Sequence, residues 1–350
     1  MYSAKQYITD LMRDRKNDPI SKVIKYLLLL VSHCYNLIVK ANLFLYSSKM
    51  LKTYKADAGV VSIGNITLGG TGKTPFVIML SKLLAENKRR PAVLIRGYGE
   101  DEWKLLEERL GRLGTKIFVG RDRIRNAKEA RKQGADTLIM DDGFQHIRLE
   151  RDLNIALIDT TDPFGNRHLF PRGILREPIA NLKRADLIAL TKVDNARSLN
   201  TIEEEIRRIV PDKPVIKTSH RVREIIDLED RSVKKSDFIK GRKVCILSAI
   251  CDPSYFKYTV ERLGALVGHE GIFPDHFVYR VTDIIDIRKI CKKENIRYIV
   301  TTEKDAVKLK GLTLPGDGCR ILVLSIDLEI IEGGEALNDA LRRLYMRNSG

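Results

Sequence analysis

The stretch Gly59-Val60-Val61-Ser62-Ile63-Gly64-Asn65-Ile66-Thr67-Leu68-Gly69-Gly70-Thr71-Gly72-Lys73-Thr74-Pro75 decides the fold class of this chain. A short β-branched run leads into a glycine-rich turn with Gly-Lys-Thr, and an amphipathic segment follows. In such a loop the backbone N–H groups cradle phosphate oxygens, while Lys73 reaches the β- and γ-phosphates and Thr74 binds Mg²⁺. Thr67 stands where the usual pattern has its first glycine. The order of elements favours a nucleoside triphosphate site over a glycine-rich turn before an ordinary helix.

Composition limits the classes of protein to consider. The chain has 350 residues, of which 43% are hydrophobic and 31% charged, as in a globular protein with room for two α/β domains. Its formal charge of +16 favours an anionic partner: nucleic acid, phospholipid head groups or a phosphorylated substrate. The five cysteines form no Cys-x-x-Cys pair, so neither a disulfide framework nor a zinc site is indicated, and a reduced cytosolic environment fits best.

The N-terminal segment combines an apolar run with basic flanks. Residues 26–39 are mostly apolar but include Ser32, His33 and Asn36, and the run is shorter than the ~20 residues of a spanning helix. Lysines and arginines flank the run on both sides, and tyrosines lie near its ends. These features predict either an amphipathic helix on an anionic membrane surface or a helix packed against the main domain.

From Asp57 onward, strand-like and helix-like segments alternate. Short continuous apolar runs are typical of strands buried on both faces of a mostly parallel sheet. We therefore predict an α/β fold of the P-loop NTPase type, with helices on both faces of the sheet. The expected strands are Val60–Ile63, Ala92–Ile95, Ile117–Val119, Thr137–Met140, Ile155–Ile158 and Leu187–Leu190, with helices at Pro75–Asn87 and Asp122–Gln133.

A second, smaller α/β unit is expected towards the C-terminus. Its predicted elements are a strand at Val244–Leu247, helices near Pro253–Leu263 and Ile284–Lys293, and a strand at Tyr298–Thr301. The polar stretch before it reads as a connector. The predicted organisation is a membrane-associated helical segment (1–52), a kinase core (53–210), a connector (211–240), the smaller domain (241–320), and a return strand with a final helix (321–350).

An acidic pair follows the fourth predicted strand. Asp141 and Asp142 stand where a Walker-B strand holds Mg²⁺ and its waters, and Gln145 and His146 follow one turn later. Because ligands bind beyond the carboxyl ends of parallel strands, this pair should lie near the phosphate loop. We interpret Thr74, Asp141 and Asp142 as metal ligands, in preference to a solvated acidic turn.

These motifs resemble those of the tetraacyldisaccharide 4'-kinases, the lipid A 4'-kinases of lipopolysaccharide synthesis. The phosphate loop of that family shares the departure at the first glycine. The further matching motifs, in family order, are Arg96-Gly97-Tyr98-Gly99, Val119-Gly120-Arg121-Asp122-Arg123, Asp141-Asp142-Gly143-Phe144-Gln145-His146, Arg151-Asp152-Leu153, Phe164-Gly165-Asn166, Leu175-Arg176-Glu177-Pro178, Phe273-Pro274-Asp275-His276 and Thr302-Glu303-Lys304-Asp305-Ala306-Val307-Lys308.

The resemblance implies transfer of the γ-phosphoryl group of ATP to the 4'-hydroxyl of a tetraacyldisaccharide 1-phosphate, giving lipid IVA, at the cytoplasmic face of the bacterial inner membrane. It implies Asp101 as the general base, oriented by His276 from the second domain, with Lys73 and Asp142 completing the catalytic set. Two departures stand out: glutamate replaces the glycine of a Gly-Asp-Glu motif before Asp101, and Phe277 replaces a second histidine.

The remaining candidates surround these catalytic groups. Guanidinium forks suit phosphate, so four arginines and a neighbouring glutamate are candidates for the anionic substrate: Arg121, Arg123, Arg172, Arg176 and Glu177. The residues expected around ATP are Asn65, Thr67, Gly69, Gly70, Thr71, Gly72, Lys73, Thr74, Gln145 and His146.

Two other classes of protein stay open on the residues alone. Thr191-Lys192-Val193-Asp194 follows an apolar strand and resembles the guanine-specificity motif of GTPases, so a regulatory or metal-insertion GTPase is the alternative. Against it, no Asp-x-x-Gly switch motif directly follows a predicted strand, and Asp141-Asp142-Gly143 has the wrong spacing. A nucleic-acid-binding ATPase would suit the charge, but the basic residues are spread along the chain and no recognition pattern accompanies them, so we expect no nucleic acid partner.

Overall fold

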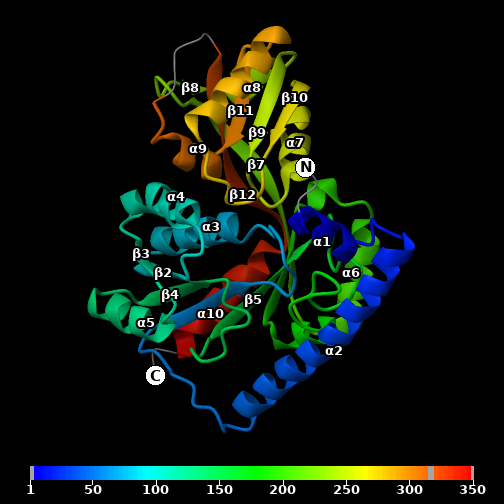
Figure 1. Cartoon of the computed structure of the whole chain (residues 1–350). Helices are drawn as coiled ribbons and strands as arrows, with labels where there is room; N and C mark the ends of the chain where they lie inside the picture. Colours follow the sequence, from blue (N-terminus) through cyan, green and yellow to red (C-terminus); the bar gives the residue numbers. More distant parts are fainter. Residues whose placement is uncertain (1–3, 314–318, 348–350) are drawn as a thin grey trace.

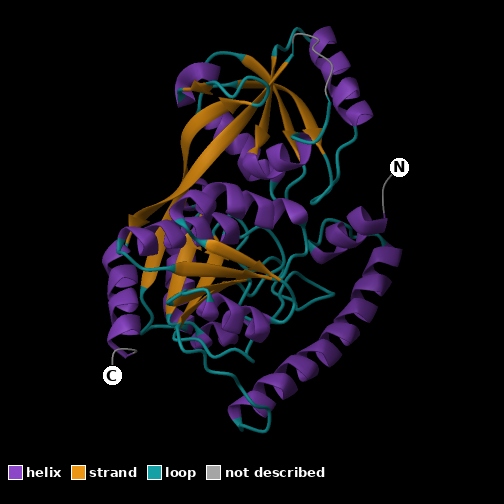
Figure 2. Cartoon of the chain, turned by 90° about the vertical axis from the view of Figure 1, so that its left-hand side faces the viewer, coloured by secondary structure: helices purple, strands orange, loops and turns teal. Residues whose placement is uncertain are grey.

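The computed structural model describes residues 4–313 and 319–347. In this part of the chain a larger core lobe, a smaller lobe and a pair of N-terminal helices are distinguished (Figures 1 and 2). The core lobe is built on β1–β6, and the small lobe on β8–β11. The strands β7 (Val215–Asp227) and β12 (Arg320–Glu332) run through both lobes and join them.

One continuous sheet connects the described strands in the order β10-β9-β11-β12-β7-β6-β5-β1-β4-β2-β3, and β8 pairs with β7. All pairings are parallel except β12 with β7 and β7 with β8. The remaining strands are β1 (Gly59–Gly64), β2 (Pro91–Ile95), β3 (Lys116–Val119), β4 (Thr137–Asp141), β5 (Leu153–Asp159), β6 (Leu187–Thr191), β8 (Val233–Lys234), β9 (Lys243–Ser248), β10 (Leu266–Ile272) and β11 (Tyr298–Thr302).

Helices cover the sheet and complete its hydrophobic cores. The helices of the main body are α3 (Lys73–Glu86), α4 (Glu100–Leu110), α5 (Arg123–Lys132), α6 (Leu199–Ile209), α7 (Pro253–Arg262), α8 (Val281–Lys293), α9 (Glu303–Leu309) and α10 (Gly334–Arg347). Short 3₁₀ turns lie at Gly111–Leu113, Ile179–Arg184, Val193–Asn195 and Ser236–Ile239. The helix α10 returns the chain to the core lobe, where Leu337 and Leu344 join the cluster around β1 and β5.

The apolar runs fold as predicted. All six strands expected in the core lobe are present, each within two residues of its expected ends, and every residue of β1, β2, β4 and β6 is buried. Burial on both faces explains why these strands read as continuous apolar runs. The mostly parallel α/β fold with a second, smaller unit is confirmed.

The stretch 211–240 is not only a connector. It contains β7, a strand of 13 residues, and the short strand β8. In β7 buried, half-exposed and exposed positions alternate irregularly. Its first residues pair with β6 in the core lobe, and β12 pairs with it from Lys217 to Asp227. Charged residues at the exposed and half-exposed positions give this segment the composition of a loop. The domain boundaries themselves stay a prediction.

The N-terminal helices lie along one side of the core lobe (Figure 1). The helix α1 spans Ala4–Met12, and α2 spans Pro19–Ser47, so α2 is longer than the apolar run predicted. Only Ser21, Lys25 and Ser32 of α2 are buried. The helix contacts the core lobe through Ser32 and Tyr35 but leaves most of its apolar side chains uncovered, so both the packed helix and the membrane-surface helix stay predictions. By its length and composition alone, α2 is also long and apolar enough to cross a membrane; the structure contains no membrane.

Candidate functional site

The glycine-rich loop joins β1 to α3 at the carboxyl edge of the sheet. Gly72 caps α3 in the left-handed conformation (φ 84°), which glycine adopts without strain, and Lys73 and Thr74 form the first turn. The loop is braced from behind: Thr191 Oγ1 donates to the Thr71 carbonyl at 3.0 Å. The N-terminus of α3 is therefore positioned for phosphate oxygens, as the sequence predicts.

The Lys73 ammonium is held by two side chains, each of which directly follows a strand, β1 or β4. It donates to Asn65 Oδ1 at 3.2 Å and lies 3.7 Å from Asp142 Oδ1. The side chain of Asn65 is buried and also donates to the Thr67 carbonyl at 2.9 Å. In this structure Asn65 and Thr67 therefore shape the loop from below, and their contact with ATP stays a prediction.

The two adjacent aspartates after β4 have opposite environments. Asp142 has a left-handed backbone (φ 53°), and its Oδ1 lies 2.7 Å from Arg176. Burial favours its neutral form, but Lys73 and Arg176 outweigh that effect and hold the pKa of Asp142 below its ordinary value. Asp141 is buried, and its Oδ1 has no hydrogen-bond partner. Burial, with the negative charge of Glu102, raises the pKa of Asp141 to about 7.

A second group of residues lies across the gap between the lobes. Asp101, in the first turn of α4, is 4% exposed, and its Oδ1 lies 3.0 Å from Nδ1 of His276, in the loop after β10. Gly99 makes room for this pair. A Cβ at Gly99 would lie 2.5 Å from the Nδ1 of His276, too close for any real side chain. The structure thus brings together the aspartate and histidine that the resemblance pairs.

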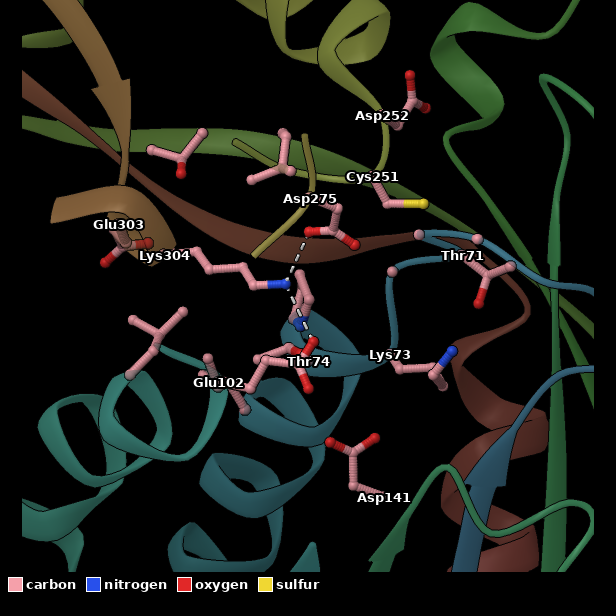
Figure 3. A pocket seen from close by; sticks show the side chains of 18 of the residues that line it. Thr71, Lys73, Thr74, Glu102, Asp141, Cys251, Asp252, Asp275, Glu303 and Lys304 are labelled. Atoms are coloured by element: carbon pink, nitrogen blue, oxygen red, sulfur yellow. Dashed lines mark hydrogen bonds and ion pairs between the residues drawn. The ribbon is translucent and has the colours of Figure 1, made fainter. Parts of the chain in front are cut away.

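Charged side chains of the small lobe surround this pair. Lys304 on α9 lies 3.1 Å from Glu102 and 3.4 Å from Asp275, and Figure 3 shows it extending between these two carboxylates. Burial alone would raise the pKa of Asp101, but Lys304, His276 and then Lys308 hold it below its ordinary value.

A pocket of about 770 Å³ lies between the two lobes and unites these groups. Residues of both lobes form its walls, and Figure 3 shows Lys73, Thr74 and Asp141 in the same space as Asp275 and Lys304. Of the predicted site residues, those on the pocket wall are Gly69, Gly70, Thr71, Gly72, Lys73, Thr74, Arg123, Asp141, Asp142, Arg176 and His276.

The other predicted residues do not line the pocket in this structure. Gln145 Nε2 donates to the Asn65 carbonyl at 2.9 Å and to Glu177 at 3.1 Å, so both side chains brace the loop. His146 lies among arginines; burial first, then Arg123, lowers its pKa to about 4. Arg172 ties the turn between α1 and α2 to the core lobe through Asp14 at 2.7 Å, and Arg121 is exposed. Their roles in binding stay predictions.

The structure also places Lys192 and Asp194 of the GTPase-like motif, and of these two residues Lys192 lines the pocket. Lys192 is buried and forms ion pairs with Asp159 and with Asp252 of the small lobe. Asp194 accepts a hydrogen bond from Tyr255 at 2.8 Å and pairs with Arg262. The two residues that read guanine in GTPases are thus engaged within the protein. A lysine and an aspartate after an apolar strand do not by themselves reveal such internal partners.

Fold and site together define a phosphotransferase of the P-loop class, with a phosphate loop, a strand ending in carboxylates and a second lobe over the pocket. A family model described as tetraacyldisaccharide-1-P 4'-kinase matches residues 24–345. The chain therefore belongs to this family, which confirms the prediction of an ATP-dependent kinase of lipid A biosynthesis. The GTPase alternative is not favoured.

Individual relatives agree with the family model. A tetraacyldisaccharide 4'-kinase of Anaeromyxobacter dehalogenans (strain 2CP-C) is 35% identical over 323 residues, covering 85% of this chain and 84% of the relative. One of Desulfatibacillum aliphaticivorans is 32% identical over 361 residues, covering 94% and 95%. The crystal structure of LpxK from Aquifex aeolicus in complex with ATP superposes with a TM-score of 0.70 at 28% identity, covering 92% of this chain and 99% of that one.

Proposed function

We propose that this chain transfers the γ-phosphoryl group of ATP to the 4'-hydroxyl of a tetraacyldisaccharide 1-phosphate, with Mg²⁺, at an anionic membrane surface on the cytoplasmic side of the bacterial inner membrane. One observation carries the proposal: a single pocket is lined by the phosphate loop from the core lobe and by His276 from the small lobe. A nucleotide triphosphate and an acceptor hydroxyl can therefore meet there in line, which phosphoryl transfer requires.

The donor half of the site suits ATP with Mg²⁺. The unpartnered Asp141 Oδ1 and the Thr74 hydroxyl are hard oxygen donors beside the phosphate loop. Within residues 4–313 and 319–347, no three His, Cys, Asp or Glu side chains form a group that could hold a metal alone. Mg²⁺ fits this arrangement because it needs only one or two carboxylates when phosphates and waters complete its coordination. When bound, it neutralises charge on the phosphates, and Lys73 adds a further cation.

The acceptor half of the site lies opposite. The Asp101–His276 pair is suited to receive the proton of the sugar hydroxyl, which general-base catalysis requires. Arg123 and Arg176 line the same pocket and offer guanidinium groups to an anionic substrate. Since the pair joins α4 of the core lobe to the loop after β10, its geometry depends on how the lobes sit against each other.

The helix α2 supports the membrane part of the proposal, because many of the side chains that it exposes are large and apolar. Two of its polar side chains face the protein: Ser32 donates to the Leu169 carbonyl at 2.8 Å, and Tyr35 donates to the Arg176 carbonyl at 2.9 Å. Leu37 and Ile38 point outwards, each 66% exposed. Burying one such side chain stabilises a protein by about 1.5–3 kcal/mol, and a lipid interface offers a similar gain.

Label transfer from the nucleotide tests this function. The purified protein is incubated with the disaccharide 1-phosphate, Mg²⁺ and either γ-labelled ATP or γ-labelled GTP, and the lipids are separated by chromatography. We expect a labelled bis-phosphorylated lipid with ATP. Release of labelled phosphate into water without labelled lipid would contradict the proposal.

A further inference from the structure

A loop that carries one of the pocket arginines is bonded to the phosphate-loop segment. Residues 164–177 lie between β5 and β6, and we call them the arginine loop. The Arg176 N–H donates to the Ile66 carbonyl at 2.7 Å, and the Leu68 N–H donates to the Ile174 carbonyl at 2.6 Å. Leu68 and Arg176 also line the pocket. The backbone of the arginine loop is therefore held against the segment that leads into the phosphate loop.

The side chain of Arg176 lies beside two charged groups of the nucleotide site. Its Nη1 donates to Asp142 Oδ1 at 2.7 Å, and the Lys73 ammonium lies 3.7 Å from the same oxygen. A guanidinium carries five N–H donors, so the bond to Asp142 leaves others for an anionic ligand. Because the arginine side chain is long, the point that its guanidinium reaches depends on where the backbone of Arg176 is held.

The helix α2 also holds the arginine loop. Tyr35 Oη donates to the Arg176 carbonyl at 2.9 Å. Ser32, which is 4% exposed, donates to the Leu169 carbonyl at 2.8 Å and accepts from the Arg172 N–H at 3.0 Å. Tyr35 and Ser32 are three positions apart and lie on the same face of α2. The backbone of Arg176 is therefore bonded to the phosphate-loop segment through its N–H and to α2 through its carbonyl.

The contact between Tyr35 and the arginine loop combines packing with a directed hydrogen bond. The Tyr35 ring meets Phe170 edge to face, with 6.1 Å between the ring centroids and 75° between the planes. Burial raises the pKa of Tyr35 above its ordinary value, although Arg176 opposes this effect. The hydroxyl therefore keeps its proton at neutral pH and acts as the donor.

A third tie joins the arginine loop to the turn before α2. The Asp14 carboxylate lies 2.7 Å from Lys25 Nζ and 2.7 Å from Arg172 Nη2, and it accepts from Asn166 at 3.1 Å. Burial opposes its ionisation, but hydrogen bonds from Lys25 and then Arg172 lower the pKa of Asp14 to about 2. The arginine loop is thus fastened to the N-terminal helices at several points along its length.

We propose that Tyr35 and Ser32 are positioning residues that act through the arginine loop. They hold the backbone of Arg176 so that its guanidinium stands in the pocket, where it binds the anionic head group of the acceptor. The inference rests on the proposed function and deepens it. It gives α2 a task inside the site that is separate from any membrane contact, because Leu37 and Ile38 are exposed whereas Ser32 and Tyr35 face the loop.

Steady-state kinetics of the full-length protein in mixed detergent micelles test this task. Tyr35→Phe removes the hydroxyl but keeps the ring that packs on Phe170. We expect the KM for the disaccharide 1-phosphate to rise roughly three- to tenfold, which is the effect of one lost hydrogen bond. The KM for ATP and kcat should stay within about twofold of the parent, because uniform binding of the acceptor is what is lost.

Tyr26→Phe is the matched control. Tyr26 belongs to the same helix, is 63% exposed and makes no hydrogen bond within the described part of the chain. This variant removes the same hydroxyl from α2 without touching the arginine loop, so both KM values should equal those of the parent. An acceptor KM that rises equally in Tyr26→Phe and Tyr35→Phe would overturn the inference.

A double-mutant cycle tests whether Tyr35 acts through Arg176. Arg176→Gln removes the guanidinium, and Tyr35→Phe should then weaken acceptor binding no further. The cycle is measured as the dissociation constant for the disaccharide 1-phosphate in the same micelles without ATP, so that it does not depend on turnover. Effects of the two substitutions that multiply would overturn the inference, since they would show that Tyr35 acts independently of Arg176.

Folding, anchoring and activity controls complete the test. If Tyr35→Phe fails to fold, Ser32→Ala carries the same comparison, because it also removes a bond to the arginine loop. Co-sedimentation with anionic vesicles should be unchanged in both variants; a loss of co-sedimentation that accounts for the higher KM would overturn the inference. A parent protein that transfers no phosphate to the lipid would overturn the proposed function. An active parent whose acceptor KM does not respond to Tyr35→Phe overturns this inference alone.

Discussion

The carboxylate of Asp141 offers a substitution with an unusual expected result: lost activity together with increased stability. Burial first, then the nearby charge of Glu102, raises its pKa from 3.8 to about 7 in the folded protein. Between these two pH values the folded state holds a proton that the unfolded state has released. The contribution of Asp141 to stability therefore falls as the pH rises through this window.

The magnitude follows from the difference between the two pKa values. About three pH units, at roughly 1.4 kcal/mol per unit, correspond to a cost of up to about 4 kcal/mol at pH 8. Asparagine has the same shape without the charge, so Asp141→Asn removes this cost. We expect a rise in the free energy of unfolding of up to about 4 kcal/mol at pH 8, shrinking to about 1–2 kcal/mol at pH 5.

The assay is urea unfolding of the nucleotide-free and Mg²⁺-free protein at both pH values, with kinase activity measured in parallel. Asp142→Asn is the control, since Asp142 pairs with Lys73 and Arg176, and its loss removes the carboxylate from two partly buried cations. This control should be destabilised at pH 8. An Asp141→Asn protein that is no more stable than the parent at pH 8, or equally shifted at both pH values, would refute the reasoning.

Three further predictions concern the loop, the base and the membrane. Lys73→Met should lower kcat by several powers of ten, because the cation that follows the transferred phosphate is lost; near-normal turnover would contradict the kinase site. Gly99→Ala should lower kcat on the order of 100-fold without changing ATP affinity, because its Cβ would separate the aspartate–histidine pair; unchanged kcat would show that the pair is not needed. Leu37→Glu with Ile38→Glu should reduce co-sedimentation with anionic vesicles, whereas Leu266→Glu, at an equally exposed leucine of β10, should not; equal effects would remove α2 as the anchor.

The sequence revealed the parts of the fold that are buried on both faces. Such strands have continuous apolar sequences, so the predicted bounds of β1, β2, β4 and β6 lie close to the observed ones. The strand β7 escaped notice because charged residues stand at its exposed and half-exposed positions. The edge strand β10 was missed for a related reason, since most of its residues are exposed or half-exposed.

The candidate site was predictable as a set of motifs but not as an arrangement. The phosphate loop and the acidic pair follow neighbouring strands, so sheet topology alone brings them together. The contact between Asp101 and His276 spans 175 positions, and no local pattern encodes it. The sequence also gave no indication that Asp141 and Asp142 differ, because the difference arises from burial and from Arg176, which reaches only one of them.

The position of the new phosphate on the product tests the central claim most directly. After reaction with ATP and the disaccharide 1-phosphate, a phosphorus–proton correlation NMR spectrum of the purified lipid shows which sugar carbon carries the added group. We predict a new phosphate on the 4' position, with the original 1-phosphate intact and no such product from Lys73→Met. A phosphate on any other hydroxyl, or ATP consumption that leaves the lipid unchanged, would contradict the account.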